Sequence, residues 1–142
     1  AVERASNANG DGVKPFLLHA AIAAEHDRAT RKNDTDWATI ALLYDRLEKL
    51  EPTPVIALNR AVAVGMVEGP EAALAIISAL TKDGALDEYH LLHAARADFL
   101  RRLERYPEAV ESYARALERV GNDSERRFLE RRLRDVRARM KP

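Results

Sequence analysis

The clearest helix pair in the sequence is HLLHAARADFLRRLERYPEAVESYARAL, residues 90–117. Apolar residues recur at helical spacing on both sides of Tyr106-Pro107, which predicts one helix over about residues 87–104 and a second that ends at Val120. Small residues stand where the two helices would cross, and large ones beside them would fill the remaining gap. The residues expected at this packing are Ala97, Leu100, Ala109, Tyr113 and Ala116.

A weaker copy of the same pattern occurs earlier in the chain. Asn-Arg-Ala at residues 59–61 aligns with Ala-Arg-Ala at 95–97, a shift of 36 residues, and Pro-Glu-Ala at 70–72 aligns with 107–109, a shift of 37. This period is close to the tetratricopeptide unit of about 34 residues, which is a helix, a short turn and a second helix. We therefore predict an all-α fold, an α-α superhelix of tetratricopeptide-like stacked antiparallel helix pairs, with an irregular helical bundle as the alternative.

Seven helical segments are expected in total, and none alternates apolar and polar residues as a half-buried strand would. The segments before the clearest pair cover about residues 15–31, 36–51, 55–66 and 70–83. Thr35 or Asp36 is the expected cap of the second segment. Trp37 and Tyr44 share the apolar stripe of that segment, so we predict that both are core residues of the first pair, which the first two segments form.

The last segment, residues 124–142, follows a helix stop at Gly121 and has Ser124 as its expected N-cap. Because no later helix pairs with it, we interpret it as the polar capping helix that closes the array. The whole of residues 1–142 is expected to be a single domain, with residues 1–14 as a linker or the end of a preceding helix.

Most of the charge asymmetry also lies in this last segment. Residues 124–142 have eight basic and three acidic side chains, a net charge of +5, and the remainder of the chain carries −5. We expect the arginines to form a solvated face, in which Glu130 pairs with Arg134 and Asp135 with Arg139 at i, i+4 spacing. Attraction to an acidic surface and a nonspecific grip on nucleic acid are the alternatives.

The composition is that of a soluble globular domain, with 46% apolar residues among 142 and 23 basic side chains against 23 acidic ones. The sequence contains neither an uninterrupted apolar run of about 18 residues nor an N-terminal secretory signal. It has no cysteine, which excludes disulfides, a thiolate zinc site and a cysteine nucleophile. We expect a bacterial cytoplasmic protein that does not associate with a membrane.

Histidines are the strongest candidates for metal ligands, since His19 and His26 are seven residues apart and His90 and His93 three apart. The chain has no HExxH motif, and histidines at such positions are more often polar or capping residues than ligands. It also lacks a glycine-rich phosphate loop and the strand-to-helix turn of a serine hydrolase. We therefore expect no enzyme activity, no metal and no cofactor.

The candidate site consists of polar residues in the first helices of two successive predicted helix pairs. Both helices are otherwise apolar. In a stacked array such helices line a concave surface, where arginine holds a peptide or a carboxylate through paired hydrogen bonds. The alternative is that the two arginines bridge adjacent helices by pairing with Asp98 or Glu71. The residues of the predicted partner-binding groove are Asn59, Arg60, His93 and Arg96.

Five longer motifs, in this order, resemble the C-terminal region of one bacterial protein family. They are LLHAAIAAEH at 17–26, TDWATIALLYD at 35–45, PVIALNRAVAV at 54–64, YHLLHAARADFLRRL at 89–103 and ERRFL at 125–129. The family is the extracytoplasmic-function (ECF) type RNA polymerase sigma factors that carry an appended tetratricopeptide-like domain. The resemblance covers about residues 14–134.

This resemblance implies a regulatory, protein-interaction domain at the C-terminal part of a longer sigma factor that acts in transcription initiation. The promoter-reading regions precede this domain in the family, so the segment itself is expected to read no promoter. The implied partners are the sigma regions of the same chain, RNA polymerase or a regulator, with the oligomeric state left open. Glu104 stands where the resemblance leads us to expect a glycine, in the turn between the fifth and sixth helices. A small-molecule-sensing or metal-binding helical domain is the alternative function.

Overall fold

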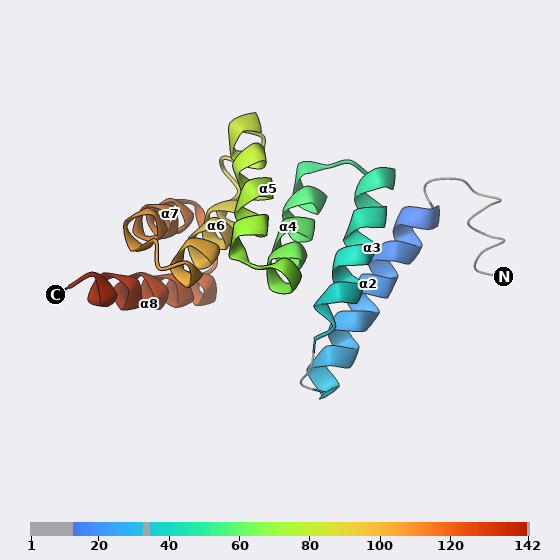
Figure 1. The fold of residues 1–142 in the computed structure, drawn as a ribbon, viewed down its shortest axis with the longest axis horizontal. Helices are drawn as coiled ribbons and strands as arrows, with labels where there is room; N and C mark the ends of the chain where they lie inside the picture. The colour runs from blue at the N-terminus through green and yellow to red at the C-terminus, as the bar shows by residue number, and fades with distance from the viewer. Residues whose placement is uncertain (1–12, 33–34, 142) are drawn as a thin grey trace. The chain divides into compact units, whose positions relative to one another are not determined.

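The structure is a computed structural model that describes residues 13–32 and 35–141, and over these residues it is entirely helical (Figure 1). The described residues form seven helices packed as sequential antiparallel pairs, which confirms the all-α prediction for this part of the chain. The helices are α2 (Val13–Lys32), α3 (Trp37–Leu50), α4 (Pro54–Glu68), α5 (Pro70–Asp83), α6 (His90–Arg102), α7 (Tyr106–Arg119) and α8 (Asp123–Met140).

Residues 1–12 of the predicted linker lie outside the described residues, and Val13 and Lys14 belong to α2. Two compact units divide the chain, the first ending at Val67 and the second beginning at Glu68. The first unit contains α2, α3 and α4, and the second contains α5 to α8. No helix among residues 13–32 and 35–141 is long and apolar enough to cross a membrane.

The first unit is held by a small apolar core to which each of its three helices contributes. Ile22 of α2, Leu47 of α3 and Ile56 of α4 pack together and are at most 6% exposed. Asp36 caps α3, because its side chain accepts a hydrogen bond from the Thr39 backbone N–H at 3.1 Å. The Thr39 hydroxyl also donates to Asp36 Oδ2 at 2.7 Å, and this bond, together with the one from the backbone N–H, lowers the pKa of the Asp36 carboxyl.

Trp37 and Tyr44, predicted as core residues, lie at the edge of the core, and Tyr44 packs against the cluster of Ile22, Leu47 and Ile56. Ile40 and Leu47 of the same stripe are completely buried, whereas Trp37 and Tyr44 are only partly buried. Trp37 is the first residue of α3, at the end of the helix, where its ring meets His26 edge-on with the ring centroids 6.0 Å apart. The periodicity identified the correct face of the helix, but it does not report how far the neighbouring helix covers that face.

The core of the second unit lies where α6 and α7 cross. Ala97, Ala109 and Ala116 are 0% exposed, and Leu100 and Tyr113 are 1% exposed, so the predicted packing of the clearest helix pair is confirmed. The three alanines remove side-chain bulk at the crossing, and the two large side chains fill the space beside it. α8 then packs on α7 through an apolar stripe. The buried residues of this stripe are Leu129, Leu133 and Val136.

Two predicted helix ends differ from the structure. The break between α6 and α7 lies at residues 103–105 rather than at Tyr106-Pro107, because a proline is accepted in the first turn of a helix, where its missing N–H has no partner. The N-cap of α8 is Asn122 rather than Ser124. The Asn122 side chain accepts a hydrogen bond from the Glu125 backbone N–H at 3.0 Å.

Glu104 occupies the turn between α6 and α7 with a left-handed backbone, φ 60°. The Arg105 N–H donates to the Leu100 carbonyl and the Glu104 N–H to the Arg101 carbonyl, both at 2.9 Å. This pair of hydrogen bonds is the Schellman ending of a helix, whose left-handed position is usually a glycine. The expectation of a glycine at position 104 therefore agrees with the backbone that the turn adopts.

Candidate functional site

The first half of the predicted groove lies on α4, in the first unit. The Arg60 guanidinium approaches two carboxylates of α3, with its Nε 3.5 Å from Asp45 Oδ1 and its Nη1 3.5 Å from Glu48 Oε1. The Arg60 side chain is 31% exposed, and the neighbouring Asn59 is also partly buried. Arg60 therefore links α3 to α4 and keeps part of its surface open to a partner.

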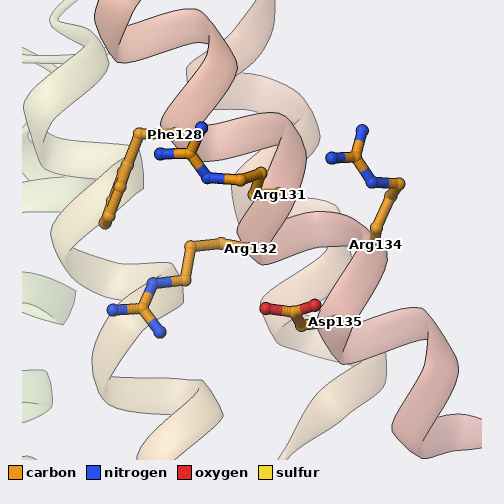
Figure 2. Close-up of a pocket in the computed structure, with 5 residues that line it drawn as sticks. All are labelled: Phe128, Arg131, Arg132, Arg134 and Asp135. Carbon is orange, nitrogen blue, oxygen red and sulfur yellow. The ribbon is translucent and has the colours of Figure 1, made fainter.

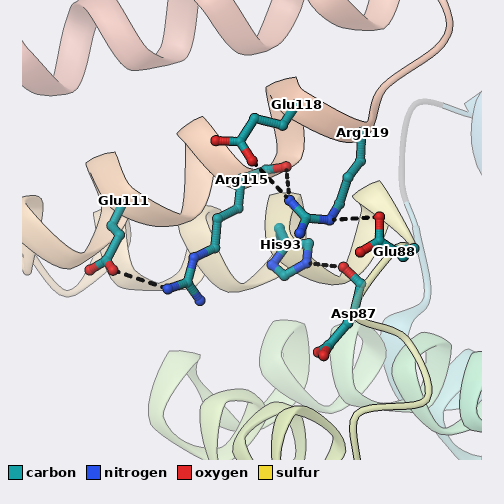
Figure 3. Close-up of polar contacts among 7 residues, drawn as sticks. All are labelled: Asp87, Glu88, His93, Glu111, Arg115, Glu118 and Arg119. Carbon is teal, nitrogen blue, oxygen red and sulfur yellow. Dashed lines mark hydrogen bonds and ion pairs between the residues drawn. The ribbon is translucent and has the colours of Figure 1, made fainter.

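The second half lies on α6, in the second unit. His93 is 6% exposed, and its Nε2 lies 2.7 Å from the backbone carbonyl oxygen of Asp87 (Figure 3). Because a carbonyl oxygen only accepts, Nε2 is the donor in this hydrogen bond. Arg96 Nη1 donates to Ser112 Oγ of α7 at 2.6 Å, and Ser112 is 2% exposed. His93 thus ties α6 to the preceding turn, and Arg96 ties α6 to α7.

Both arginines therefore have intramolecular contacts across neighbouring helices, but not with the partners expected from the sequence. Asp98 pairs instead within its own helix, with Arg101 Nη2 at 2.6 Å and Arg102 Nη2 at 3.2 Å. Asp98 lies two residues beyond Arg96, about 200° around the helix, so the two side chains point to different faces. Asn59 and Arg60 belong to one compact unit and His93 and Arg96 to the other. Their joint action in one groove stays a prediction.

The remaining histidines also contact other side chains. His19 Nε2 lies 3.1 Å from Glu51 Oε2, and His90 Nε2 lies 2.8 Å from Glu125 Oε2, which joins α6 to the start of α8. Within residues 13–32 and 35–141, no three histidine, aspartate or glutamate side chains gather where they could hold a metal ion.

Arginines of α6, α7 and the turn between them are mostly engaged by carboxylates of the same unit. Arg105 holds both oxygens of Glu108 at 2.8 and 2.9 Å, and this contact lowers the pKa of the Glu108 carboxyl. Figure 3 shows two further pairs, one between Arg115 and Glu111 and one from Arg119 toward Glu88 before α6. These pairs fix the positions of the guanidinium groups and neutralise them locally.

The arginines of α8 behave differently: all but the partly buried Arg132 are exposed, as predicted for a solvated face, but the two predicted ion pairs are absent. Neither the Glu130–Arg134 pair nor the Asp135–Arg139 pair forms in the described part of the chain. The i, i+4 spacing permits such ion pairs, but exposed pairs gain little free energy, so the spacing alone does not decide whether one forms. The signal that marked these arginines was the charge asymmetry of the sequence.

A hollow of about 340 Å³ lies on this face of α8 (Figure 2). Its wall includes the Phe128 ring, which is 47% exposed and has the Arg132 guanidinium over it, 5.1 Å from the ring centroid. This cation–π contact holds Arg132 against the ring. The residues that line the hollow are Phe128, Arg131, Arg132, Arg134 and Asp135.

Comparison with known proteins finds one uncharacterized relative in Rhizobium meliloti (strain 1021). It is 45% identical over 119 residues, which are 84% of this chain and 28% of the relative. The chain thus spans little more than a quarter of the length of the curated relative that it matches. No protein-family model matches the chain. No solved structure matches it either.

Proposed function

We propose that the chain is a tetratricopeptide-like regulatory domain of an ECF-type RNA polymerase sigma factor. In this proposal it contacts the sigma regions of the same chain, RNA polymerase or a regulator, and thereby controls transcription initiation in the bacterial cytoplasm. The observation that carries the proposal is the resemblance of five motifs, in order, to that family. One of these motifs, residues 89–103, forms α6, which contributes the fully buried Ala97 to the packing with α7.

The architecture supports a role in binding macromolecules. Successive antiparallel helix pairs offer extended outer surfaces to a partner, and repeat proteins of this type use such surfaces for recognition. The hollow on α8 is an open surface feature lined by charged side chains and one aromatic ring. It suits a protein segment better than a small molecule, because a small-molecule pocket is usually a mostly apolar cleft that buries its ligand.

The relative from Rhizobium meliloti supports the idea that the segment works as a module of a longer protein. The aligned region makes up 28% of the relative, so most of that protein is additional sequence. A module of this kind would act on the remainder of its chain or bring a second protein to it.

The proposal is tested by isolating the partners of the full-length protein that carries this chain. We expect RNA polymerase to co-purify with the full-length protein, and the set of partners or the level of transcription to change when residues 15–142 are deleted. If the deletion alters neither the partners nor transcription, the regulatory function is wrong. If polymerase is absent from both preparations, the assignment to a sigma factor is wrong.

A further inference from the structure

α8 exposes arginines that have no acidic partner within the described part of the chain. None of its arginines lies within ion-pair distance of a carboxylate there, whereas four arginines of α6 and α7, and Arg105 in the turn between them, do. Arg126 is engaged in another way, since it donates to the Val120 carbonyl at 3.0 Å. The arginines of α8 are Arg126, Arg127, Arg131, Arg132, Arg134, Arg137 and Arg139.

Their arrangement gives this charge a defined place. Arg127, Arg131 and Arg134 follow one another at spacings of four and three residues, which places them on one side of α8, and all three are exposed. Figure 2 shows Arg131 and Arg132 extending toward the side of the helix on which Phe128 lies. The hollow thus combines guanidinium groups with one exposed aromatic wall.

We propose that this hollow binds an acidic segment of a protein partner, in which an apolar side chain is flanked by carboxylates. The planar fork of arginine matches a carboxylate with two parallel hydrogen bonds, and Phe128 offers a surface for the apolar side chain. A volume of about 340 Å³ is at the lower end of the range of small binding pockets, about 300–1,000 Å³, which fits a few side chains. This inference rests on the proposed protein-interaction function and names the chemistry of the partner.

The charge of the surrounding unit favours an acidic segment over nucleic acid. Residues 68–123 of the same unit have eleven acidic and seven basic side chains, a net charge of −4. A long polyanion would meet this acidic remainder, because phosphate binding depends on many positive charges over an extended surface. A short acidic segment needs to contact only the exposed face of α8.

The test measures the binding of a fluorescein-labelled peptide of repeated Glu-Leu-Glu units to the full-length protein by fluorescence anisotropy. The double variant Arg131→Glu/Arg134→Glu is expected to weaken binding about tenfold, since each exposed ion pair contributes up to about 1 kcal/mol. Phe128→Ala is expected to weaken it severalfold. The matched control is Arg137→Glu/Arg139→Glu, which changes the charge equally at two exposed arginines of the same helix outside the lining and is expected to have little effect. Circular dichroism checks that each variant remains folded.

Three outcomes would overturn the inference. The first is the absence of peptide binding, and the second is an equal loss with Arg137→Glu/Arg139→Glu, which would indicate unspecific attraction to a basic helix. The third is tighter binding of a single-stranded DNA oligonucleotide than of the peptide, with the same dependence on Arg131 and Arg134. If the peptide fails to bind while deletion of residues 15–142 still alters transcription, the acidic partner is wrong and the proposed function stands.

Discussion

Glu104 is held in a backbone conformation that glycine adopts more easily than any other residue. Its left-handed φ of 60° costs a residue with a side chain about 1–2 kcal/mol. Glu104→Gly is therefore expected to raise the free energy of unfolding by about 0.5–1 kcal/mol, after the greater freedom of glycine in the unfolded chain is subtracted. Urea denaturation measures the change. Glu104→Ala is the control and should bring no such gain, because alanine keeps the strain; a loss of stability in Glu104→Gly would contradict the left-handed turn.

Substitution of Arg96 tests whether this residue is a structural bridge between helices or a free groove residue. Its 2.6 Å hydrogen bond to the buried Ser112 hydroxyl predicts that Arg96→Ala lowers the free energy of unfolding by about 1–2 kcal/mol. Ser112→Ala removes the acceptor, so the double variant should cost less than the two single changes together, by at least about 0.5 kcal/mol. Thermal and urea unfolding of the four proteins give this coupling. A coupling near zero, together with weaker partner binding, would favour the groove.

The beginning of α8 offers a test at the scale of a helix. Asn122→Ala removes the side chain that accepts from the Glu125 N–H, and we expect a loss of about 1 kcal/mol in the free energy of unfolding. Ser124 lies two residues further on, is exposed and is already inside the helix. Ser124→Ala is therefore expected to change stability little. Equal losses in both variants, measured by urea denaturation, would mean that the cap is not at Asn122.

The helices and the faces through which they pack could be predicted from the sequence, because both depend on the local spacing of apolar residues. The alanines at the α6–α7 crossing were identified from residue type and position alone, whereas the glycine-like turn at residue 104 was expected from the family resemblance. The depth of burial of Trp37 could not be predicted, since it depends on how far a separate helix extends. The prediction of ion pairs on α8 was wrong for a related reason, because the i, i+4 spacing permits contact without making it favourable in water.

At the scale of the whole molecule, the repeat located the candidate groove residues but not their contacts. Arg60 and Arg96 occupy equivalent positions in the aligned segments, and each bridges to a neighbouring helix. Their partners could not be predicted, because they lie on the adjacent helix of the chain, whose rotation is set by packing. The unpaired arginines of α8 were visible in the sequence only as an excess of charge, and their grouping around Phe128 required the structure.

The most direct test of the proposed regulatory function measures promoter-dependent transcription with purified RNA polymerase and the full-length protein. Ala97→Glu places a carboxylate in the fully buried α6–α7 crossing and should disrupt this helix pair, whereas Ala79→Glu changes the charge equally at an exposed position of α5. We predict that Ala97→Glu changes the rate of initiation about fivefold or more, the scale of a typical regulatory coupling, and that Ala79→Glu leaves it unchanged. Equal rates for the unaltered protein and for Ala97→Glu would contradict the account.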